Sequence, residues 1–271
     1  MVMAAEAAAS IGVHKLRLTG GEPLVKRNIL SICERCAAID GISEVCMTTN
    51  GVLLPRMAKD LKAAGVKRLN ISLDTLSPEK YAYITRIGTL DQALRGIESA
   101  LDAGFERLKI NVVLIGGFND DEIPALAGLT MRYPADVRFI ELMPMTENSE
   151  FGQRAYVPGT AVSDALPELT ASEQKDGIAK LYRLPGAKGN VGLISAVSSH
   201  FCAACNRIRL TADGKLKPCL HSSQEYSIKG MSFDGMREEL KRAILAKPAC
   251  HAPLSASEHS GAGRSMNQIG G

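Results

Sequence analysis

The distribution of hydrophobic and polar positions along the chain predicts alternating strands and helices. Short β-branched or leucine-rich runs are each followed by a polar break and then by an amphipathic helical pattern. The predicted strands are Lys15–Leu18, Glu44–Met47, Arg68–Leu73, Leu108–Leu114 and Val137–Leu142. The predicted helices are Val2–Ile11, Arg27–Ile39, Pro55–Ala64, Leu90–Ala103 and Asp121–Met131. Strands separated by helix-sized gaps favour an α/β fold with a parallel sheet, closed or partly closed into a barrel.

The pattern loosens after about Pro144, which predicts two regions. We expect residues 1–144 to form an incomplete parallel βα barrel and residues 145–271 to form a C-terminal extension. A β-rich section of this extension runs from Leu181 to Leu220. Because the chain starts with a predicted helix, we expect the first strand of the barrel to belong upstream of this sequence.

Three cysteines in the last third have the spacing of a metal centre. Cys202 and Cys205 are separated by two residues, and an Asp-Gly turn can bring Cys219 back towards them. Three thiolates can hold three irons of a four-iron cluster and leave the fourth iron open. A structural zinc site with a fourth ligand such as His200 or His221 is the alternative that the spacing leaves open.

Two arginines follow the second of these cysteines. Side chains alternate along an extended strand, so Cys205, Arg207 and Arg209 are expected to share one face. Forked guanidinium groups beside an open iron favour a phosphorylated substrate. A two-residue turn would place Cys219 opposite Ile208, on the other face, and we therefore expect a bulge or kink near Pro218.

Unusual polar and glycine residues of the first region follow the predicted strands. They are Thr19–Pro23, Thr48–Gly51, Ser72–Asp74, the pair Lys109 and Asn111, and Glu141–Pro144. Parallel βα barrels carry their active sites at this end of the strands. Gly-Gly and Asn-Gly are also common turn signals, and methionine often fills a core, so each segment alone has a structural alternative. Together they predict a shared pocket.

Composition narrows the class of protein. A net charge of +3 is too small to indicate a nucleic-acid partner, and seven cysteines do not favour a secreted disulfide framework. No apolar run is long enough to span a bilayer, and Met1–Ser10 lacks the basic start of a signal peptide. We expect a soluble, cytoplasmic protein that binds neither nucleic acid nor a membrane.

Several segments together resemble one known family. Leu16–Leu24, which reads LRLTGGEPL, is similar to the adenosylmethionine-binding segment of radical SAM enzymes. With four further segments it resembles the GTP 3′,8-cyclase (MoaA) family of molybdenum cofactor biosynthesis. These segments are Thr48–Gly51, Ser72–Asp74, Phe139–Met143 and Cys202–Arg209. The likeness runs nearly from end to end and includes the double-glycine terminus of Arg264–Gly271.

The resemblance implies a radical SAM fold and particular site residues. Positions that contact S-adenosylmethionine in the family match Gly21, Ser72 and Met143. Positions that contact GTP match Arg17, Thr48, Lys109, Arg207, Ile208 and Arg209. Ligands of a four-iron cluster whose open iron binds the purine match Cys202, Cys205 and Cys219. The implied reaction converts GTP to (8S)-3′,8-cyclo-7,8-dihydroguanosine 5′-triphosphate. Family precedent also suggests a homodimer, with cyclic pyranopterin monophosphate synthase as the next enzyme of the pathway.

One departure from the family bears on activity. Radical SAM chemistry needs a first cluster on a Cys-x3-Cys-x2-Cys motif, and the residues before Arg17 contain no cysteine. Cys33 and Cys36 share a helical face and are expected to pack as small hydrophobes, while Cys46 and Cys250 lack partners at metal spacing. We expect an N-terminally truncated cyclase, inactive as it stands. A non-catalytic iron–sulfur module that binds GTP or a partner is the alternative. A peptide-modifying radical SAM maturase is less favoured, because it does not require the Arg-x-Arg pair.

Overall fold

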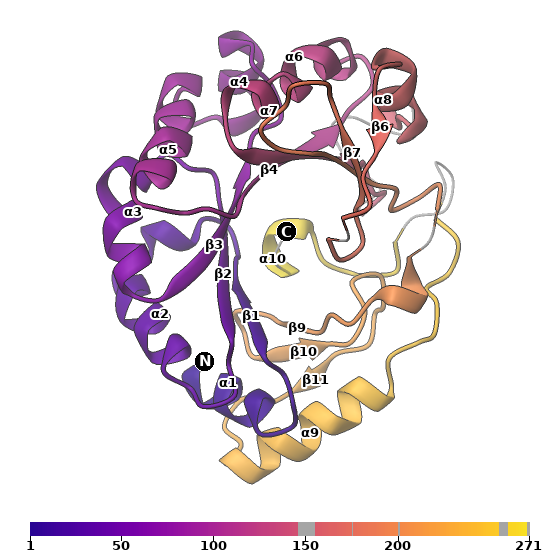
Figure 1. The fold of residues 1–271 in the computed structure, drawn as a ribbon. Helices are drawn as coiled ribbons and strands as arrows, with labels where there is room; N and C mark the ends of the chain where they lie inside the picture. Colours follow the sequence, from indigo (N-terminus) through magenta and orange to yellow (C-terminus); the bar gives the residue numbers. More distant parts are fainter. Residues whose placement is uncertain (146–154, 175, 200, 255–259, 270–271) are drawn as a thin grey trace.

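The computed structural model describes residues 1–145, 155–174, 176–199, 201–254 and 260–269. Its centre is an eight-stranded sheet in the order β1-β2-β3-β4-β5-β8-β7-β6 (Figure 1). Strands β1 to β5 and β8 run parallel, whereas β7 and β6 run antiparallel. The bounds are β1 Lys15–Leu18, β2 Glu44–Thr49, β3 Val66–Ser72, β4 Leu108–Leu114, β5 Ala135–Glu141, β6 Thr170–Ala171, β7 Lys180–Arg183 and β8 Val191–Ile194.

The sheet is open. Among the described residues β1 and β6 form its two edges and do not pair with each other. This confirms the predicted partial barrel, and all five predicted strands are present with nearly the predicted bounds. Because β6, β7 and β8 extend the sheet past position 144, the division into 1–144 and 145–271 stays a prediction.

Helices α2 to α8 lie on the outer side of the curved sheet, whereas α10 lies inside its curve and α9 lies away from it beside α1 (Figure 1). The bounds of the helices are α1 Val2–Ala9, α2 Ile29–Ala37, α3 Leu54–Ala63, α4 Pro78–Thr85, α5 Leu90–Asp102, α6 Ile123–Ala127, α7 Leu129–Arg132, α8 Thr160–Ala165, α9 Phe233–Leu245 and α10 Met266–Ile269. Short 3-10 turns are η1 Pro23–Val25, η2 Asp120–Glu122 and η4 Cys202–Ala204. The helix predicted over Asp121–Met131 is instead divided into η2, α6 and α7, with Gly128 at the junction of the two α-helices.

Helix α5 shows how local sequence sets the packing. Thr89 and Gln92 form a capping box that fixes where the helix begins. Its buried face includes Gly96, where an added Cβ would lie 2.1 Å from the carbonyl oxygen of Gly51. Only glycine allows this close approach to the loop that follows β2. The packing therefore holds the Asn-Gly loop at the carboxyl end of the sheet.

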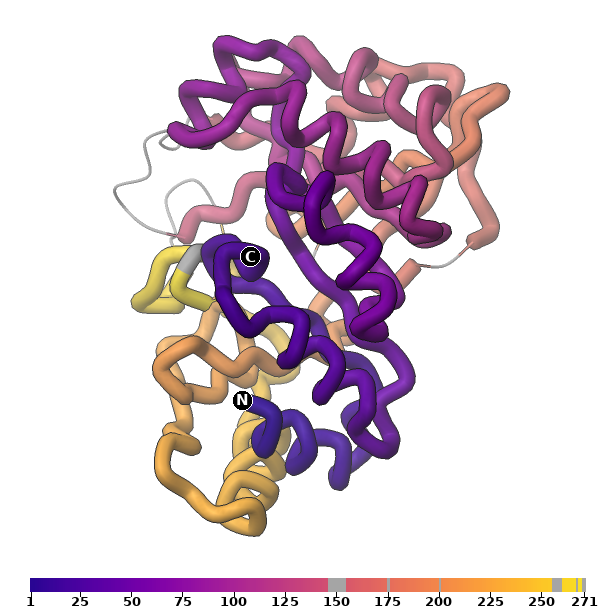
Figure 2. The backbone as a smooth tube through the Cα atoms, turned by 90° about the vertical axis from the view of Figure 1, so that its left-hand side faces the viewer, coloured from indigo at the N-terminus to yellow at the C-terminus, as the bar shows by residue number. Residues whose placement is uncertain are grey.

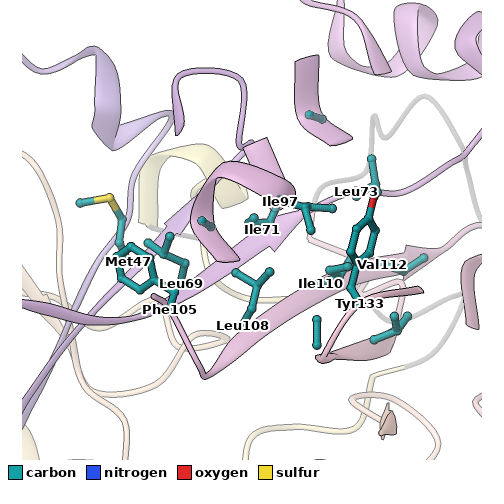
Figure 3. Packing of buried hydrophobic residues seen from close by; sticks show 14 of the residues in the cluster. Met47, Leu69, Ile71, Leu73, Ile97, Phe105, Leu108, Ile110, Val112 and Tyr133 are labelled. Atoms are coloured by element: carbon teal, nitrogen blue, oxygen red, sulfur yellow. The ribbon is translucent and has the colours of Figure 1, made fainter. Parts of the chain in front are cut away.

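The two faces of the sheet differ in polarity. Along β3, Leu69 and Ile71 point into the hydrophobic core below the helices, where Figure 3 shows them near Ile97. Arg68 and Asn70 alternate with them and so occupy the opposite, inner face. Both polar residues are nevertheless buried. A buried strand with polar residues at every second position thus lines the interior of the partial barrel.

A smaller antiparallel sheet lies across from the inner face (Figure 1). It consists of β9 Arg209–Leu210, β10 Lys215–Lys217 and β11 Tyr226–Ser227. A second hydrophobic cluster joins this sheet to α1 and α9, with Leu216, Met236 and Leu240 among its buried members. Figure 2 shows α1 and α9 together at one end of the molecule, so the first helix of the chain packs on the C-terminal region.

The register of the small sheet differs from the predicted one. Lys217 pairs with Arg209, whereas the predicted two-residue turn would pair Lys217 with Leu210. The pairing ends there, because β10 stops at Lys217 and β9 starts at Arg209. The predicted two-residue turn, which would have set Cys219 opposite Ile208, is therefore wrong.

A longer turn explains this difference. The Thr211 N–H donates to the Lys215 carbonyl at 2.8 Å, which leaves three residues in the turn instead of two. Gly214 has a φ of 84°, in the left-handed region that glycine adopts without strain. A bend at Pro218 ends the strand, where a kink was predicted.

The described part of the C-terminus packs at the open end of the barrel. Ala262 and Ile269 form a hydrophobic cluster with Met145, and Met143 packs against it. The double-glycine terminus of the family resemblance lies outside the described residues. Among the described helices, none has both the length and the apolar character that a membrane span requires.

Candidate functional site

Polar side chains from neighbouring strands lie side by side on the inner face of the sheet. The parallel register aligns Thr48 of β2 with Asn70 of β3, and Asn70 with Lys109 of β4. Side chains in register on adjacent strands share a face. The structure thus brings the predicted GTP contacts Thr48 and Lys109 together, with Asn70 between them.

Two further rows of in-register side chains lie on either side of the row formed by Thr48, Asn70 and Lys109. Arg17 of β1 is in register with Cys46, and Cys46 with Arg68. On the other side, Asn111 of β4 pairs in register with Arg138 of β5. Arg17 keeps contact with solvent, whereas Arg68 and Arg138 are buried. The predicted contact Arg17 therefore shares its face with two arginines that the sequence analysis missed.

Positive charge accumulates on this face. Burial, followed by the charges of Arg138 and Arg68, lowers the pKa of Lys109 to about 6. Burial lowers the pKa of Arg138 to about 10. The charge of Asp136 opposes this shift, and the charges of neighbouring arginines add to it. Because arginine stays charged in proteins, such a shift reports crowded, poorly solvated cations rather than deprotonation. A bound polyanion would relieve this crowding.

Several buried polar atoms of these rows lack a hydrogen-bond partner within the described residues. They are Thr48 Oγ1, Arg68 Nε, Asn70 Oδ1, Asn111 Oδ1 and Arg138 Nε. Leaving a buried polar group unpaired costs about 1–3 kcal/mol. Five such atoms on one face favour a polar ligand that supplies their partners.

The glycine turn after β1 presents backbone to open space. A Cβ built on Gly20 or Gly21 would meet no atom within 4 Å, and Gly20 has a φ of 135°. The Glu22 carboxylate accepts from Leu24 N–H at 2.9 Å and from Asn50 N–H at 2.7 Å. It also accepts from Thr49 Oγ1, so Glu22 ties the glycine turn to the loop after β2.

The predicted adenosylmethionine contacts lie at one edge of the sheet. Gly21 follows β1, Ser72 ends β3 and Met143 follows β5, and all three strands run in the same direction. Gly21 and Ser72 are exposed, and Met143 is half-buried. Their positions at the carboxyl ends of parallel strands agree with the place expected for an active site.

Glu141 of the same edge holds the loop after β8. Its carboxylate accepts from Gly159 N–H, Val197 N–H and Ser198 N–H, each at 2.8 Å. Three accepted bonds make Glu141 a structural residue of the edge.

The segment Cys202–Arg209, which we call the cysteine–arginine segment, approaches the inner face from the smaller sheet. Arg207 is a cause of the lowered pKa of Arg17, after burial, and Arg17 is one cause of the lowered pKa of Arg209. Burial and then Arg207 lower the pKa of Arg209 to about 10. These cations therefore lie close enough to repel one another. Ile208 instead packs its side chain against the second hydrophobic cluster.

The donor chemistry at the three cysteines suits an iron–sulfur cluster. Burial raises the pKa of Cys205, but the Arg207 N–H and the nearby Lys247 ammonium bring it below its ordinary value. A lowered pKa favours the thiolate that binds metal. Within the described residues no three His, Cys, Asp or Glu side chains converge closely enough to hold a single metal ion. The choice between an iron–sulfur cluster and zinc therefore rests on the number of cysteines in the motif. His200, one proposed zinc ligand, lies outside the described residues.

Buried Lys217 anchors the loop that carries Cys219. Its ammonium donates to the Ser222 carbonyl at 2.6 Å and to the Ala262 carbonyl at 3.1 Å. Arg264 adds a second link by binding Glu225 and Asp213. The C-terminal segment therefore supports the third cysteine of the predicted metal site.

Cys250 contacts cysteines that are distant from it in the sequence. It lies in hydrogen-bonding contact with Cys202, and with Cys219 and two histidines it lines a cavity of about 390 Å³. The sequence spacing offered Cys250 no metal-binding partner, and these contacts arise because the chain folds back after α9. Cys33 and Cys36 are buried in α2, and burial raises the pKa of Cys33 to about 12. They pack as predicted.

Comparisons with known proteins identify the family of the chain. A radical SAM superfamily sequence model matches residues 1–130, and one described as Molybdenum Cofactor Synthesis C matches residues 135–252. A GTP 3′,8-cyclase from Alkaliphilus oremlandii is 48% identical to this chain, covering 98% of it and 84% of the relative. One from Pelotomaculum thermopropionicum is 47% identical over the same shares. The chain belongs to the GTP 3′,8-cyclase family.

A solved structure of much lower sequence identity shares the fold of this chain. Streptococcus suis SuiB superposes with a TM-score of 0.62 at 13% identity, covering 87% of this chain and 58% of SuiB. The match extends past the parallel strands into the C-terminal region of this chain. Family membership and shared fold therefore rest on separate comparisons.

Proposed function

We propose that the protein converts GTP to (8S)-3′,8-cyclo-7,8-dihydroguanosine 5′-triphosphate by S-adenosylmethionine radical chemistry in molybdenum cofactor biosynthesis. The observation that carries the proposal is the alignment of Thr48 and Lys109 on a face crowded with buried arginines. Relatives with 48% and 47% identity named GTP 3′,8-cyclase support it.

The triphosphate is the part of GTP that this face suits best. The half-buried pair Arg207 and Arg209 and the exposed Arg17 supply forked cations. The buried Lys109 amine would take up a proton when a phosphate binds beside it. Charge-assisted bonds to phosphate oxygens are stronger than neutral ones, and arginine can make two in parallel. Thr48 Oγ1 has no other partner in the described part of the chain and would bond the nucleotide.

Cys202, Cys205 and Cys219 would hold a four-iron cluster next to this face. Three protein thiolates leave one iron for a ligand, and in the proposed site that iron binds the guanine base. Arg207 and Arg209 follow the second cysteine directly, so base and phosphates are bound by one short segment. The backbone of Ile208 lies between the two arginines and completes this contact.

Gly21, Ser72 and Met143 would bind S-adenosylmethionine at the edge of the sheet. Gly21 offers backbone with open space in front of it, which suits the close approach of a ligand. Ser72 offers an exposed hydroxyl, and Met143 an adaptable apolar contact. Reduced by one electron from a cluster on the family's Cys-x3-Cys-x2-Cys motif, which this sequence does not contain, adenosylmethionine would give methionine and a deoxyadenosyl radical. The residues of the inner face would hold the GTP ribose within reach of that radical.

A fusion protein distinguishes an enzyme from a non-catalytic GTP-binding module. The residues of the Alkaliphilus oremlandii relative that precede its match to this chain are placed before Met1. The fusion is loaded with iron and sulfide, then incubated with GTP, adenosylmethionine and dithionite. We expect 5′-deoxyadenosine and the cyclised nucleotide from the fusion and neither from the 271-residue chain. A fusion that binds GTP but forms neither product would favour the module.

Two partner assignments extend the proposal. The product would pass to cyclic pyranopterin monophosphate synthase, and β1 at the edge of the sheet offers a surface for a homodimer. Sedimentation of the cluster-loaded chain tests the second assignment, and a monomer at micromolar concentration would contradict it.

A further inference from the structure

Lys247 makes three contacts with the cysteine–arginine segment. Its ammonium donates to the Cys205 carbonyl at 2.7 Å and to the Arg207 carbonyl at 2.8 Å. It also lies 3.3 Å from Cys205 Sγ. A lysine ammonium has three donors, so these contacts use its full capacity. No other side chain is recorded with three such bonds to this segment of the described chain.

The position of Lys247 is fixed by the second hydrophobic core. It comes just after α9, whose buried residues Met236, Leu240 and Ala243 pack in the cluster with α1 and β10. The ammonium therefore approaches the cysteine segment from a rigid support. Lys241, the lysine within α9, instead pairs with the nearby Glu238 carboxylate.

The two accepting carbonyls belong to residues two apart. In an extended chain such carbonyls point to the same side, while the side chains of the same residues share a perpendicular face. Cys205 has extended backbone angles, and residues 205–208 belong to no strand. Lys247 donates the hydrogen bonds to these two carbonyls that a neighbouring strand would otherwise donate. It thereby fixes the alternation that sets Cys205 and Arg207 on one face.

We propose that Lys247 is a positioning residue that both orients the cysteine–arginine segment and tunes the reduction potential of the cluster. This inference rests on the proposed function, because it assumes a cluster on Cys205. A positive charge and an N–H···S contact stabilise the more negative, reduced cluster and so raise its potential. Removing them should lower that potential and weaken binding of the metal.

The test compares Lys247→Met with Lys241→Met, which removes the same charge from the neighbouring helix α9, away from the cysteines. Both variants and the wild type are loaded anaerobically and titrated redox-potentiometrically by EPR. We expect Lys247→Met alone to shift to a more negative potential. It should also lose iron to a chelator about 10- to 100-fold more readily. Lys247→Arg should restore the potential, since it keeps the charge and N–H donors.

Each result bears on one hypothesis. Equal potentials in Lys247→Met and Lys241→Met would overturn the role of Lys247, whatever happens to iron content. If Lys247→Met does not take up iron, Lys247→Gln is measured instead, and an unchanged potential there overturns the proposal equally. A wild-type chain that takes up no cluster through Cys202, Cys205 and Cys219 would instead refute the proposed function.

Discussion

The Asp176 carboxylate contacts Lys109 Nζ on the inner face of the sheet. Asp176 comes from the loop between β6 and β7, and the same carboxylate contacts Arg138. It supplies a negative charge to Arg138 and a hydrogen-bond acceptor to Lys109 where the triphosphate is proposed to bind. Nucleotide and Asp176 therefore compete for the same partners.

Replacing Asp176 by asparagine should strengthen GTP binding and lower the unfolding free energy of the nucleotide-free chain. The variant loses a competitor for Lys109, so we expect affinity to rise about tenfold, which corresponds to about 1.4 kcal/mol. The nucleotide-free chain should lose about 1.5–3 kcal/mol, the contribution of a charged hydrogen bond. Glu173→Gln, an exposed change in the same loop, is the control. Weaker GTP binding in Asp176→Asn would show that Asp176 assists the nucleotide.

GTP binding should take up a proton at Lys109. Its pKa lies at about 6 in the free chain, below the ordinary 10.5, and a triphosphate favours the charged amine. Above about pH 6 the affinity should therefore fall as pH rises, by at most about tenfold per unit. Calorimetry in two buffers of different ionisation enthalpy measures the uptake. Lys109→Met should lack this component, and equal uptake in both chains would contradict the assignment.

The same pKa shift predicts a stability profile. Because the unfolded chain binds the Lys109 proton more tightly than the folded chain, the group destabilises the fold fully below about pH 6. This cost disappears as pH rises from about 6 to 10.5, so unfolding free energy should increase across that range. Urea titrations should show a smaller increase in Lys109→Met. If the unfolding free energy rises equally with pH in the wild type and in Lys109→Met, Lys109 is not the group whose pKa is lowered.

The guanidinium fork of the arginines should matter beyond their charge. Arg207→Lys or Arg209→Lys should weaken GTP binding by about 1.5–3 kcal/mol, or about tenfold to a hundredfold, since lysine cannot make the paired bonds. Arg17→Ala should act similarly from β1. Arg56→Lys on exposed α3 is the control. Unaltered binding in all three site variants would remove the arginines from the phosphate site.

The metal assignment predicts about one four-iron cluster in the 271-residue chain. Iron analysis after anaerobic loading should show that Cys219→Ala loses the cluster. Cys250→Ser should retain it, because the proposed ligands are only the three cysteines of the motif. About eight irons per chain would contradict the assignment, as would a cluster that needs Cys250 and survives loss of Cys219.

Much of the fold followed from local patterns. The strands were predictable because β-branched runs such as Leu108–Leu114 alternate with amphipathic helices. The two-residue turn was wrong because Asp-Gly alone does not reveal that Thr211 closes the turn. The break of the helix over Asp121–Met131 had a local signal in Gly128, which helix periodicity outweighed.

The candidate site was only partly predictable. Arg68 and Asn70 had a visible signal, since polar residues at every second position of a buried strand indicate a lined interior. Asp176, Lys247 and Cys250 had none, because each meets the site from a loop or helix end distant in sequence. Their contacts depend on how the β6–β7 loop and the segment after α9 fold back.

Nucleotide titration of the cluster-loaded chain tests the central claim most directly. If the inner face binds the triphosphate and the open iron binds guanine, GTP should bind more tightly than guanosine and more tightly than ATP. Chelating the cluster should reduce the preference for GTP over ATP while leaving the preference for the triphosphate. Equal affinity for GTP and ATP with the cluster intact, or equal affinity for GTP and guanosine, would contradict the account.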